Sequence, residues 1–386
     1  MINIRREIIN RLKRIEIVRE INKIRAIKKL DFDIALERLR YRKIITVDLD
    51  IHTENKKYYL ARREMPASPY VRNQQLAFYS FEPELCVDML TFSEELYDPI
   101  LVVPVKNELN RMKLLYKHYR MLGVHQFVVI DNYSTDGTFE WCCQQKDTRV
   151  YRIKQPYQTE RRNAWIEKVL ALTGYDKWYI VVDSDELLDY VGSETHKISE
   201  LIKVASDNKH RRILGYQVDM YNEHPLFSGG YNFEEIPTEY SWFDTDSYSI
   251  NKTKANRKGK TIDLIIGGPR NRIFGTQIQL SKQSVFYYTK EVIYCNSHYL
   301  APLLEIEDTP CYYVLKHYKY LINDRKEYLD RTEKNNFASN SYIYKKQMSA
   351  IDSNKQCSFM YEGSAQYHNS DSLRVLPYLV EIPWDE

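Results

Sequence analysis

The chain has 386 residues, which is too long for one small core and suits one large domain with additions. Lysine and arginine number 56 against 53 aspartates and glutamates, so the net charge of +3 does not indicate a dedicated nucleic-acid-binding protein. Six cysteines without zinc-like spacing predict reduced thiols, as in a cytoplasmic protein. We expect neither a signal peptide nor a membrane-spanning helix, because long apolar runs are missing.

The N-terminal region, residues 1–98, begins with a basic amphipathic segment. Apolar residues in 4–29 recur at helical spacing between lysines and arginines, which predicts a helix with a basic polar face. Such a helix either lies on an anionic membrane surface or packs on its own domain or a partner subunit, and both interpretations stay open. Residues 41–98 are irregular, with short strands expected at 43–49 and 58–62.

From residue 99 the pattern becomes regular. Continuous apolar runs, as in buried parallel strands, alternate with segments of helical periodicity. This alternation predicts an α/β fold with a doubly wound, mainly parallel sheet. The expected strands are 100–105, 127–130, 150–153 and 178–182, and the expected helices are 110–122, 138–145 and 159–172.

Three polar clusters follow the apolar strands of this unit. They are Asn107 with Glu108, residues 131–136, and residues 183–186. In open α/β sheets, ligands bind at the carboxyl ends of the strands. We therefore expect the three clusters to form one site.

The third cluster contains Asp183, Asp185 and Glu186 directly after a buried strand. Burying several unpaired carboxylates is costly, and a divalent cation with a preference for oxygen, Mg²⁺ or Mn²⁺, would relieve that cost. The alternative is a solvated acidic turn that caps the next element, and Glu186 also suits a helix start.

The second half of the chain is less regular. We expect strands at 213–220, 284–288, 292–294 and 314–320, and helices within 321–352. Residues 251–260 form a basic loop that either closes over phosphate or is simply solvated. The tail from residue 361 is expected to be irregular.

Taken together, these motifs resemble a GT-A type nucleotide-sugar glycosyltransferase, similar to family 2 in the branch that also resembles family 92. The resemblance covers residues 99–320 and rests on 104–108, 131–138, Arg162 with Asn163, and 183–186. A Gly-Gly-x-Arg segment, a histidine after a strand pair and a later His-Tyr also match that branch. Here they are 267–270, His298, and His317 with Tyr318.

The resemblance implies a Rossmann-like GT-A domain at 99–320, with a donor half (99–190) and an acceptor half (191–320). It implies flanking helices and helical additions at 1–98 and 321–386. The implied activity is inverting sugar transfer from a nucleoside-diphosphate sugar, a UDP-sugar by preference, with Mn²⁺ or Mg²⁺. The acceptor would be a glycan or lipid-linked glycan of a bacterial cell surface. The enzyme would be cytoplasmic or peripheral on the inner face of the membrane.

The resemblance also implies residue roles. Asp131 would accept from the base or ribose, and Arg162 would neutralise the diphosphate; Asp131 otherwise suits a turn former. The metal ligands would be Asp183, Asp185 and His317. The full donor-binding set would be Pro104, Asn107, Glu108, Asp131, Asn132, Arg162, Asn163, Asp183, Ser184 and Arg270.

Inverting transfer needs a general base beside the acceptor hydroxyl. Asp219, Glu186, Asp263 and His298 are candidates by residue type. Asp219 is preferred because a buried strand would place it well, while His298 matches the family branch. The sequence does not decide between them.

Two other functions stay open. A metal-dependent nucleotidyltransferase also uses carboxylates on an α/β sheet, although the glycine-rich phosphate loop expected after its first strand is missing at 104–108. The chain could instead be a non-catalytic binding or assembly protein on the same fold, but the intact acidic cluster argues against this.

Overall fold

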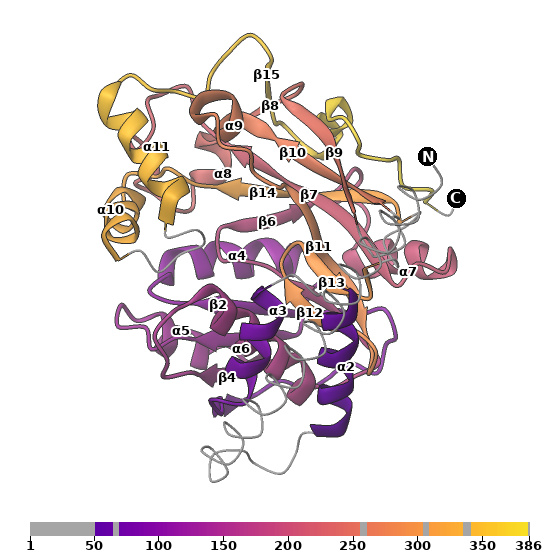
Figure 1. The fold of residues 1–386 in the computed structure, drawn as a ribbon. Helices are drawn as coiled ribbons and strands as arrows, with labels where there is room; N and C mark the ends of the chain where they lie inside the picture. The colour runs from indigo at the N-terminus through magenta and orange to yellow at the C-terminus, as the bar shows by residue number, and fades with distance from the viewer. Residues whose placement is uncertain (1–50, 65–68, 255–260, 304–308, 335–340, 385–386) are drawn as a thin grey trace, which may run out of the picture.

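The computed structural model describes residues 51–64, 69–254, 261–303, 309–334 and 341–384 (Figure 1). The helix predicted at 4–29 and the strand predicted at 43–49 lie outside these ranges. No helix of the described residues is long and apolar enough to cross a membrane. All six cysteines are free thiols.

Within the described residues, a nine-stranded sheet forms the centre of the molecule. Its strands β2, β3, β4, β5, β7 and β14 run in one direction, and β1, β11 and β6 run in the other. The predicted mainly parallel α/β sheet is therefore confirmed. The spatial order is β1 (Glu84–Asp88), β4 (Thr148–Arg152), β3 (Phe127–Asp131), β2 (Ile100–Val105), β5 (Lys177–Val181), β11 (Ser281–Tyr288), β7 (Arg212–Met220), β14 (Cys311–Tyr318) and β6 (Glu186–Asp189).

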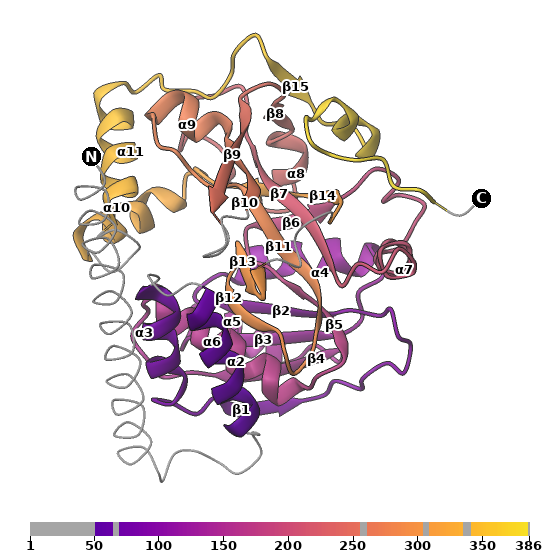
Figure 2. The same cartoon turned by 45° about the vertical axis from the view of Figure 1, so that its right-hand side comes forward.

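Helices cover both faces of the sheet (Figures 1 and 2). In β2, Leu101 and Val103 belong to one apolar core and Ile100 and Val102 to the other, because successive side chains of a strand point to opposite faces. The first core packs against α4 (Leu109–Met121), α5 (Thr138–Cys143) and α7 (Ile198–Asp207). The second packs against α2 (Ile51–Glu64), α3 (Pro69–Phe78) and α6 (Thr159–Thr173).

The sheet has a topological switch point between β2 and β5. The chain passes from β2 to β3 through α4 on one face, and from β4 to β5 through α6 on the other. Since β2 lies between β3 and β5, the two crossovers diverge and leave a crevice at the carboxyl ends of β2 and β5. Two of the polar clusters, after residues 105 and 181, follow these strand ends.

Smaller elements of the second half surround the sheet. Tyr320, Tyr328 and Phe359 form an aromatic cluster that joins the C-terminal helices to the end of β14. The elements are α8 (Ile236–Glu239), β8 (Trp242–Asp244) paired with β15 (Ser364–Gln366), β9 (Tyr248–Lys254) paired with β10 (Thr261–Gly267), α9 (Gly268–Phe274), β12 (Ile293–Asn296) paired with β13 (Tyr299–Ala301), α10 (Asp324–Lys334), α11 (Tyr342–Ser353) and a 3-10 helix (Ser370–Val375).

Three predicted segments have a different structure. Residues 58–62 belong to α2 and not to a strand, because Tyr58 and Ala61 are buried together at helical spacing. Residues 251–254 of the predicted basic loop belong to β9, whose main chain pairs with β10. The tail from residue 361 is not wholly irregular, since it contains β15 and the 3-10 helix.

Candidate active site

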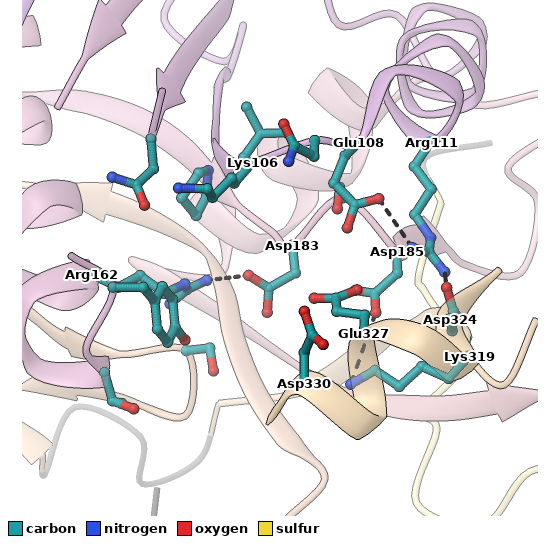
Figure 3. A pocket seen from close by; sticks show the side chains of 18 of the residues that line it. Lys106, Glu108, Arg111, Arg162, Asp183, Asp185, Lys319, Asp324, Glu327 and Asp330 are labelled. Atoms are coloured by element: carbon teal, nitrogen blue, oxygen red, sulfur yellow. Dashed lines mark hydrogen bonds and ion pairs between the residues drawn. The ribbon is translucent and has the colours of Figure 1, made fainter. Parts of the chain in front are cut away.

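A cavity of about 1250 Å³ lies at the carboxyl ends of β2 and β5 (Figure 3). It brings together most of the predicted site residues from five separate segments of the chain. Those that line it are Pro104, Asn107, Glu108, Asn132, Arg162, Asn163, Asp183, Ser184, Asp185 and His298. The predicted residues Asp131, Glu186, Asp219, Asp263, Arg270 and His317 do not line it.

The loop after β2 is held against the loop after β3. The Asn107 backbone has a left-handed φ of 56°, and its Oδ1 accepts from the Thr135 N–H at 2.7 Å. The Glu108 N–H donates to Thr138 Oγ1 at 2.9 Å. Asp136 accepts from the N–H groups of Leu109 and Thr138, so it is a turn former, although it borders the cavity.

Asp131, the predicted nucleotide ligand, is fully buried below the cavity. Its carboxylate accepts from the Ser134 N–H at 3.2 Å and pairs with Arg152 Nε at 3.1 Å. The next residue, Asn132, lines the cavity instead, and its Nδ2 donates to the carbonyls of Ile153 and Gln155 at 2.8 Å. Of these two predicted donor-binding residues, only Asn132 therefore lines the cavity.

Residues 183–185, called the acidic loop below, follow β5. The Asp183 side chain is 40% exposed and forms an ion pair with Arg162 of α6. The Asp185 side chain is 17% exposed, and its Oδ2 lies 3.4 Å from His317 Nε2 and 3.9 Å from Lys319 Nζ. Figure 3 shows both carboxylates pointing into the cavity.

The neighbouring cations keep both carboxylates ionised. Burial raises the pKa of Asp183, but the charges of Arg162 and Lys282 outweigh it, so the pKa lies below its ordinary value. Burial also raises the pKa of Asp185, but His317 and Lys319 outweigh this effect, so the pKa lies well below its ordinary value. The acidic loop therefore presents two negative charges at neutral pH.

These charges fit a divalent cation only in part. In the described part of the chain, no three His, Cys, Asp or Glu side chains are grouped so that they could hold a metal ion on their own. Both ring nitrogens of His317 already contact carboxylates, those of Asp185 and Asp219. A metal at Asp183 and Asp185 would need further oxygen ligands from a bound molecule, and a diphosphate supplies such oxygens.

His298 lines the cavity from the turn between β12 and β13. Its Nδ1 lies 2.8 Å from the Ser281 carbonyl oxygen, which fixes the tautomer with the proton on Nδ1 and leaves Nε2 as an acceptor. Burial and the nearby Lys282 charge lower the pKa of His298 to about 3. The imidazole is therefore neutral at physiological pH.

The cavity also has an acidic wall that the sequence reasoning missed. Helix α10 places Asp324, Glu327 and Asp330 along one side at spacings of three residues (Figure 3). Arg111 joins this helix to the first loop, with Nη1 3.0 Å from Glu108 Oε2 and Nη2 2.6 Å from Asp324 Oδ1. The three-residue spacing was visible in the sequence as a helical signal.

Glu108, in the loop after β2, has a distinctive electrostatic environment. Burial raises its pKa to about 7, and the charges of Glu327 and Asp185 add to the increase, while Arg111 opposes it. Other lining residues missed by the sequence reasoning are Lys106, Arg111, Tyr157, Phe233, Gln279, Lys319, Lys326 and Tyr344.

Comparisons with known proteins give weak likenesses. No protein-family model and no curated protein sequence matches the chain. One similar solved structure is glucosyl-3-phosphoglycerate synthase from Mycobacterium tuberculosis with Mn²⁺, UDP and phosphoglyceric acid, at 17% identity and a TM-score of 0.22 over 35% of this chain. Another is a mannosyltransferase from Pyrobaculum calidifontis with GDP-Man and Mn²⁺, at 15% identity and a TM-score of 0.23 over 44% of this chain. The matches span 51% and 48% of those proteins, and at these TM-scores they support no conclusion about this chain.

Proposed function

We propose that the protein is a GT-A type glycosyltransferase, similar to family 2, that transfers a sugar from a nucleoside-diphosphate sugar to a hydroxyl acceptor. One observation carries the proposal: the acidic loop, Arg162, Asn132 and the 104–108 loop meet in one cavity at the switch point of the sheet. Nucleotides bind to α/β sheets at such points, outside the carboxyl ends of the strands.

The size of the cavity suits a donor and an acceptor together. Its volume of about 1250 Å³ exceeds the roughly 300–1,000 Å³ of a pocket that holds one small ligand. In the proposal the nucleotide lies along the wall formed by 104–108 and Asn132. The transferred sugar and the acceptor occupy the space toward His298 and α10.

The charges divide into groups for a diphosphate and groups for a cation. Arg162, Lys106 and Lys319 line the cavity and offer positive charge to phosphate oxygens. Asp183 and Asp185 would hold Mn²⁺ or Mg²⁺ together with those oxygens. The chemistry supplied by such a metal would be positive charge that offsets the charge of the departing nucleoside diphosphate, which is leaving-group stabilisation.

The proton acceptor would have to line the cavity, because a general base must reach the acceptor hydroxyl. Of the predicted candidates, His298 lines the cavity, while Asp219, Glu186 and Asp263 do not. A pKa near 3 makes His298 a weak base, so its Nε2 would orient a hydroxyl by accepting its hydrogen bond. Glu108, with a pKa of about 7, joins the candidates for the base itself.

The wider role remains as the resemblance implies. We propose a UDP-sugar as donor and a glycan or lipid-linked glycan of a bacterial cell surface as acceptor. The predicted helix at 4–29 would hold the enzyme on the inner face of the membrane. If it does so, deletion of residues 1–29 will release the protein from anionic vesicles but leave donor turnover intact. Continued vesicle binding after the deletion would contradict a membrane role for this segment.

Product analysis tests the proposed activity. The protein is incubated with a panel of UDP- and GDP-sugars and Mn²⁺, with and without glycan acceptors, and the products are identified by mass spectrometry. Released nucleoside diphosphate supports glycosyl transfer. Released pyrophosphate would instead indicate a nucleotidyltransferase, and binding without turnover would indicate a non-catalytic protein.

A further inference from the structure

A chain of buried polar side chains lies beneath the acidic loop. Glu186 of β6 and His317 of β14 are register partners, as are His317 and Asp219 of β7. Cross-strand partners share a face of the sheet, and Gln217 shares it too because it lies two residues from Asp219. The topology thus collects four polar side chains on one face, directly below the loop.

The contacts among these side chains are direct. His317 Nδ1 lies 2.6 Å from Asp219 Oδ1, and Arg270 Nε donates to Asp219 Oδ2 at 2.7 Å. Arg270 Nη2 donates to Gln217 Oε1 at 2.8 Å. Gln217 Nε2 donates in turn to Glu186 Oε1 at 2.8 Å. Five residues are therefore linked by hydrogen bonds and ion pairs of ordinary length.

Both ends of this chain return to the acidic loop. Glu186 Oε2 accepts from the Asp183 N–H at 3.0 Å, and His317 Nε2 lies 3.4 Å from Asp185 Oδ2. The Asp185 carbonyl also accepts from the Tyr318 N–H at 3.0 Å. The loop and the five residues thus form a closed ring, called the support ring below: Asp185, His317, Asp219, Arg270, Gln217, Glu186 and Asp183.

The five residues below the loop are inaccessible to a substrate. Glu186 and His317 are each 1% exposed, Asp219 is 3%, Gln217 6% and Arg270 7% exposed. They do not belong to the cavity wall. Four of them are predicted from the sequence to act on the substrate or metal directly, as base candidates (Asp219 and Glu186), donor ligand (Arg270) and metal ligand (His317).

We propose that Asp219, Gln217, Arg270, Glu186 and His317 are positioning residues that fix the acidic loop from below. Asp219 holds the His317 ring, and His317 fixes the direction of the Asp185 carboxylate. Glu186 holds the Asp183 main chain at the other end of the loop. As a statement about catalysis, this inference rests on the proposed function, because orientation of Asp185 matters there for the metal and diphosphate.

The chain offers a matched control on the opposite face of the same strands. Asp189 of β6 and Lys316 of β14 form an ion pair at 2.6 Å, and they are 1% and 6% exposed. They have the same burial and the same kind of charge pairing as the support ring. No contact described for this pair reaches the acidic loop. Asp189→Asn therefore reports how breaking any buried ion pair on these strands affects amide exchange.

Amide hydrogen exchange on the full-length protein tests the positioning without any substrate. Asp219→Asn and Gln217→Met should each raise the exchange rate of the 183–185 amides about tenfold, because the ring opens. Asp189→Asn should leave those amides unchanged. Gln217→Met removes no charge and keeps the ion pairs of Asp219. It therefore keeps the test valid if Asp219→Asn folds poorly. Equal exchange of the loop amides in all three variants and the wild type would overturn the inference.

A mutant cycle tests the consequence for catalysis, read as nucleoside diphosphate released from UDP- and GDP-sugars with Mn²⁺. Asp219→Asn should reduce turnover by about 10–100-fold in the wild-type background and by less than twofold in the Asp185→Asn background. An equal reduction in both backgrounds would show that Asp219 does not act through Asp185. If the wild type itself turns over no nucleotide sugar, the proposed function fails, while the exchange measurement still judges the support ring.

Discussion

The two walls of the cavity are built in different ways. One wall consists of short loops after β2, β3 and β5, whose residues lie within 80 positions of one another and were recognised from the sequence. The other wall is α10, which starts at Asp324 and carries Glu327 and Asp330. The first wall follows from strand ends that must meet at one edge of the sheet. The second wall depends on how the C-terminal helices pack, and no local sequence motif predicts this packing.

This difference suggests a division of labour. The loop wall combines ionised Asp183 and Asp185 with Arg162, a set that suits a diphosphate and its cation. The α10 wall is acidic and faces the space assigned to the sugar and the acceptor. If the division is correct, substitutions in the loop wall will abolish donor chemistry. Substitutions in α10 will instead change acceptor use or stability.

The largest expected effect is that of Asp185→Asn. Loss of one charge from the acidic loop should reduce metal-dependent donor turnover by about 1,000-fold, as the loss of one electrostatic contact to a developing charge does in other enzymes. The matched change on the other wall, Asp330→Asn, should reduce donor hydrolysis by less than about tenfold. Steady-state rates of nucleoside diphosphate release with Mn²⁺ measure both. Similar losses for the two variants would abolish the distinction between the walls.

Arg111 connects the two walls, and its removal should mainly affect stability. Arg111→Met leaves Glu108 and Asp324 without their shared partner in a largely buried place. Breaking a buried ion pair by removing one partner costs about 3–5 kcal/mol. Urea unfolding followed by circular dichroism measures this loss. Arg120→Met, which breaks the more exposed pair with Asp147, is the control and should cost less than about 1 kcal/mol. A loss for Arg111→Met no larger than the control would contradict the assigned role of Arg111.

Glu108 should impose a pH dependence on stability. Its pKa is raised to about 7 in the folded protein from an ordinary value of 4.5. The folded state therefore binds the proton more tightly, so this residue lowers the free energy of unfolding as pH rises from about 4.5 to 7, by up to about 3 kcal/mol. The free energy of unfolding in urea of Glu108→Gln minus that of the wild type should therefore be larger at pH 8 than at pH 5. If this difference in the free energy of unfolding did not change with pH, the raised pKa of Glu108 would be refuted.

The parts of the fold that could be predicted are those with local periodicity. β2 to β5 and the helices between them were expected within one or two residues, because buried parallel strands are apolar runs and α4 and α6 repeat their apolar residues every three or four positions. The strand predicted at 58–62 is wrong. Over only five residues, a helix that buries Tyr58 and Ala61 shows the same apolar pattern as a short strand. The loop predicted at 251–260 failed at its start as well, because Asn251 and Lys252 of β9 are exposed polar residues that carry no apolar strand signal.

The location of cavity-lining residues was predictable where they directly follow a strand. Asp183 and Asp185 follow β5 and line the cavity, as does Arg162 of α6, which pairs with Asp183. The surroundings of Asp219 and His317 were not predictable, because they depend on the register of β7 with β14, which are separated by about 90 residues in the chain. Two polar residues in apolar strands predict a buried polar pair, but only the register brings Asp219 and His317 together beneath the acidic loop.

The central claim is that the cavity binds a nucleoside diphosphate and its cation at the loop wall. A crystal structure of the protein with Mn²⁺ and UDP tests it most directly, with the anomalous signal of manganese locating the metal. We expect manganese on the Asp183 and Asp185 carboxylates, the diphosphate between the metal and Arg162, and the nucleoside beside Asn132. Manganese and nucleotide bound elsewhere, or a nucleotide placed along α10 instead, would contradict it.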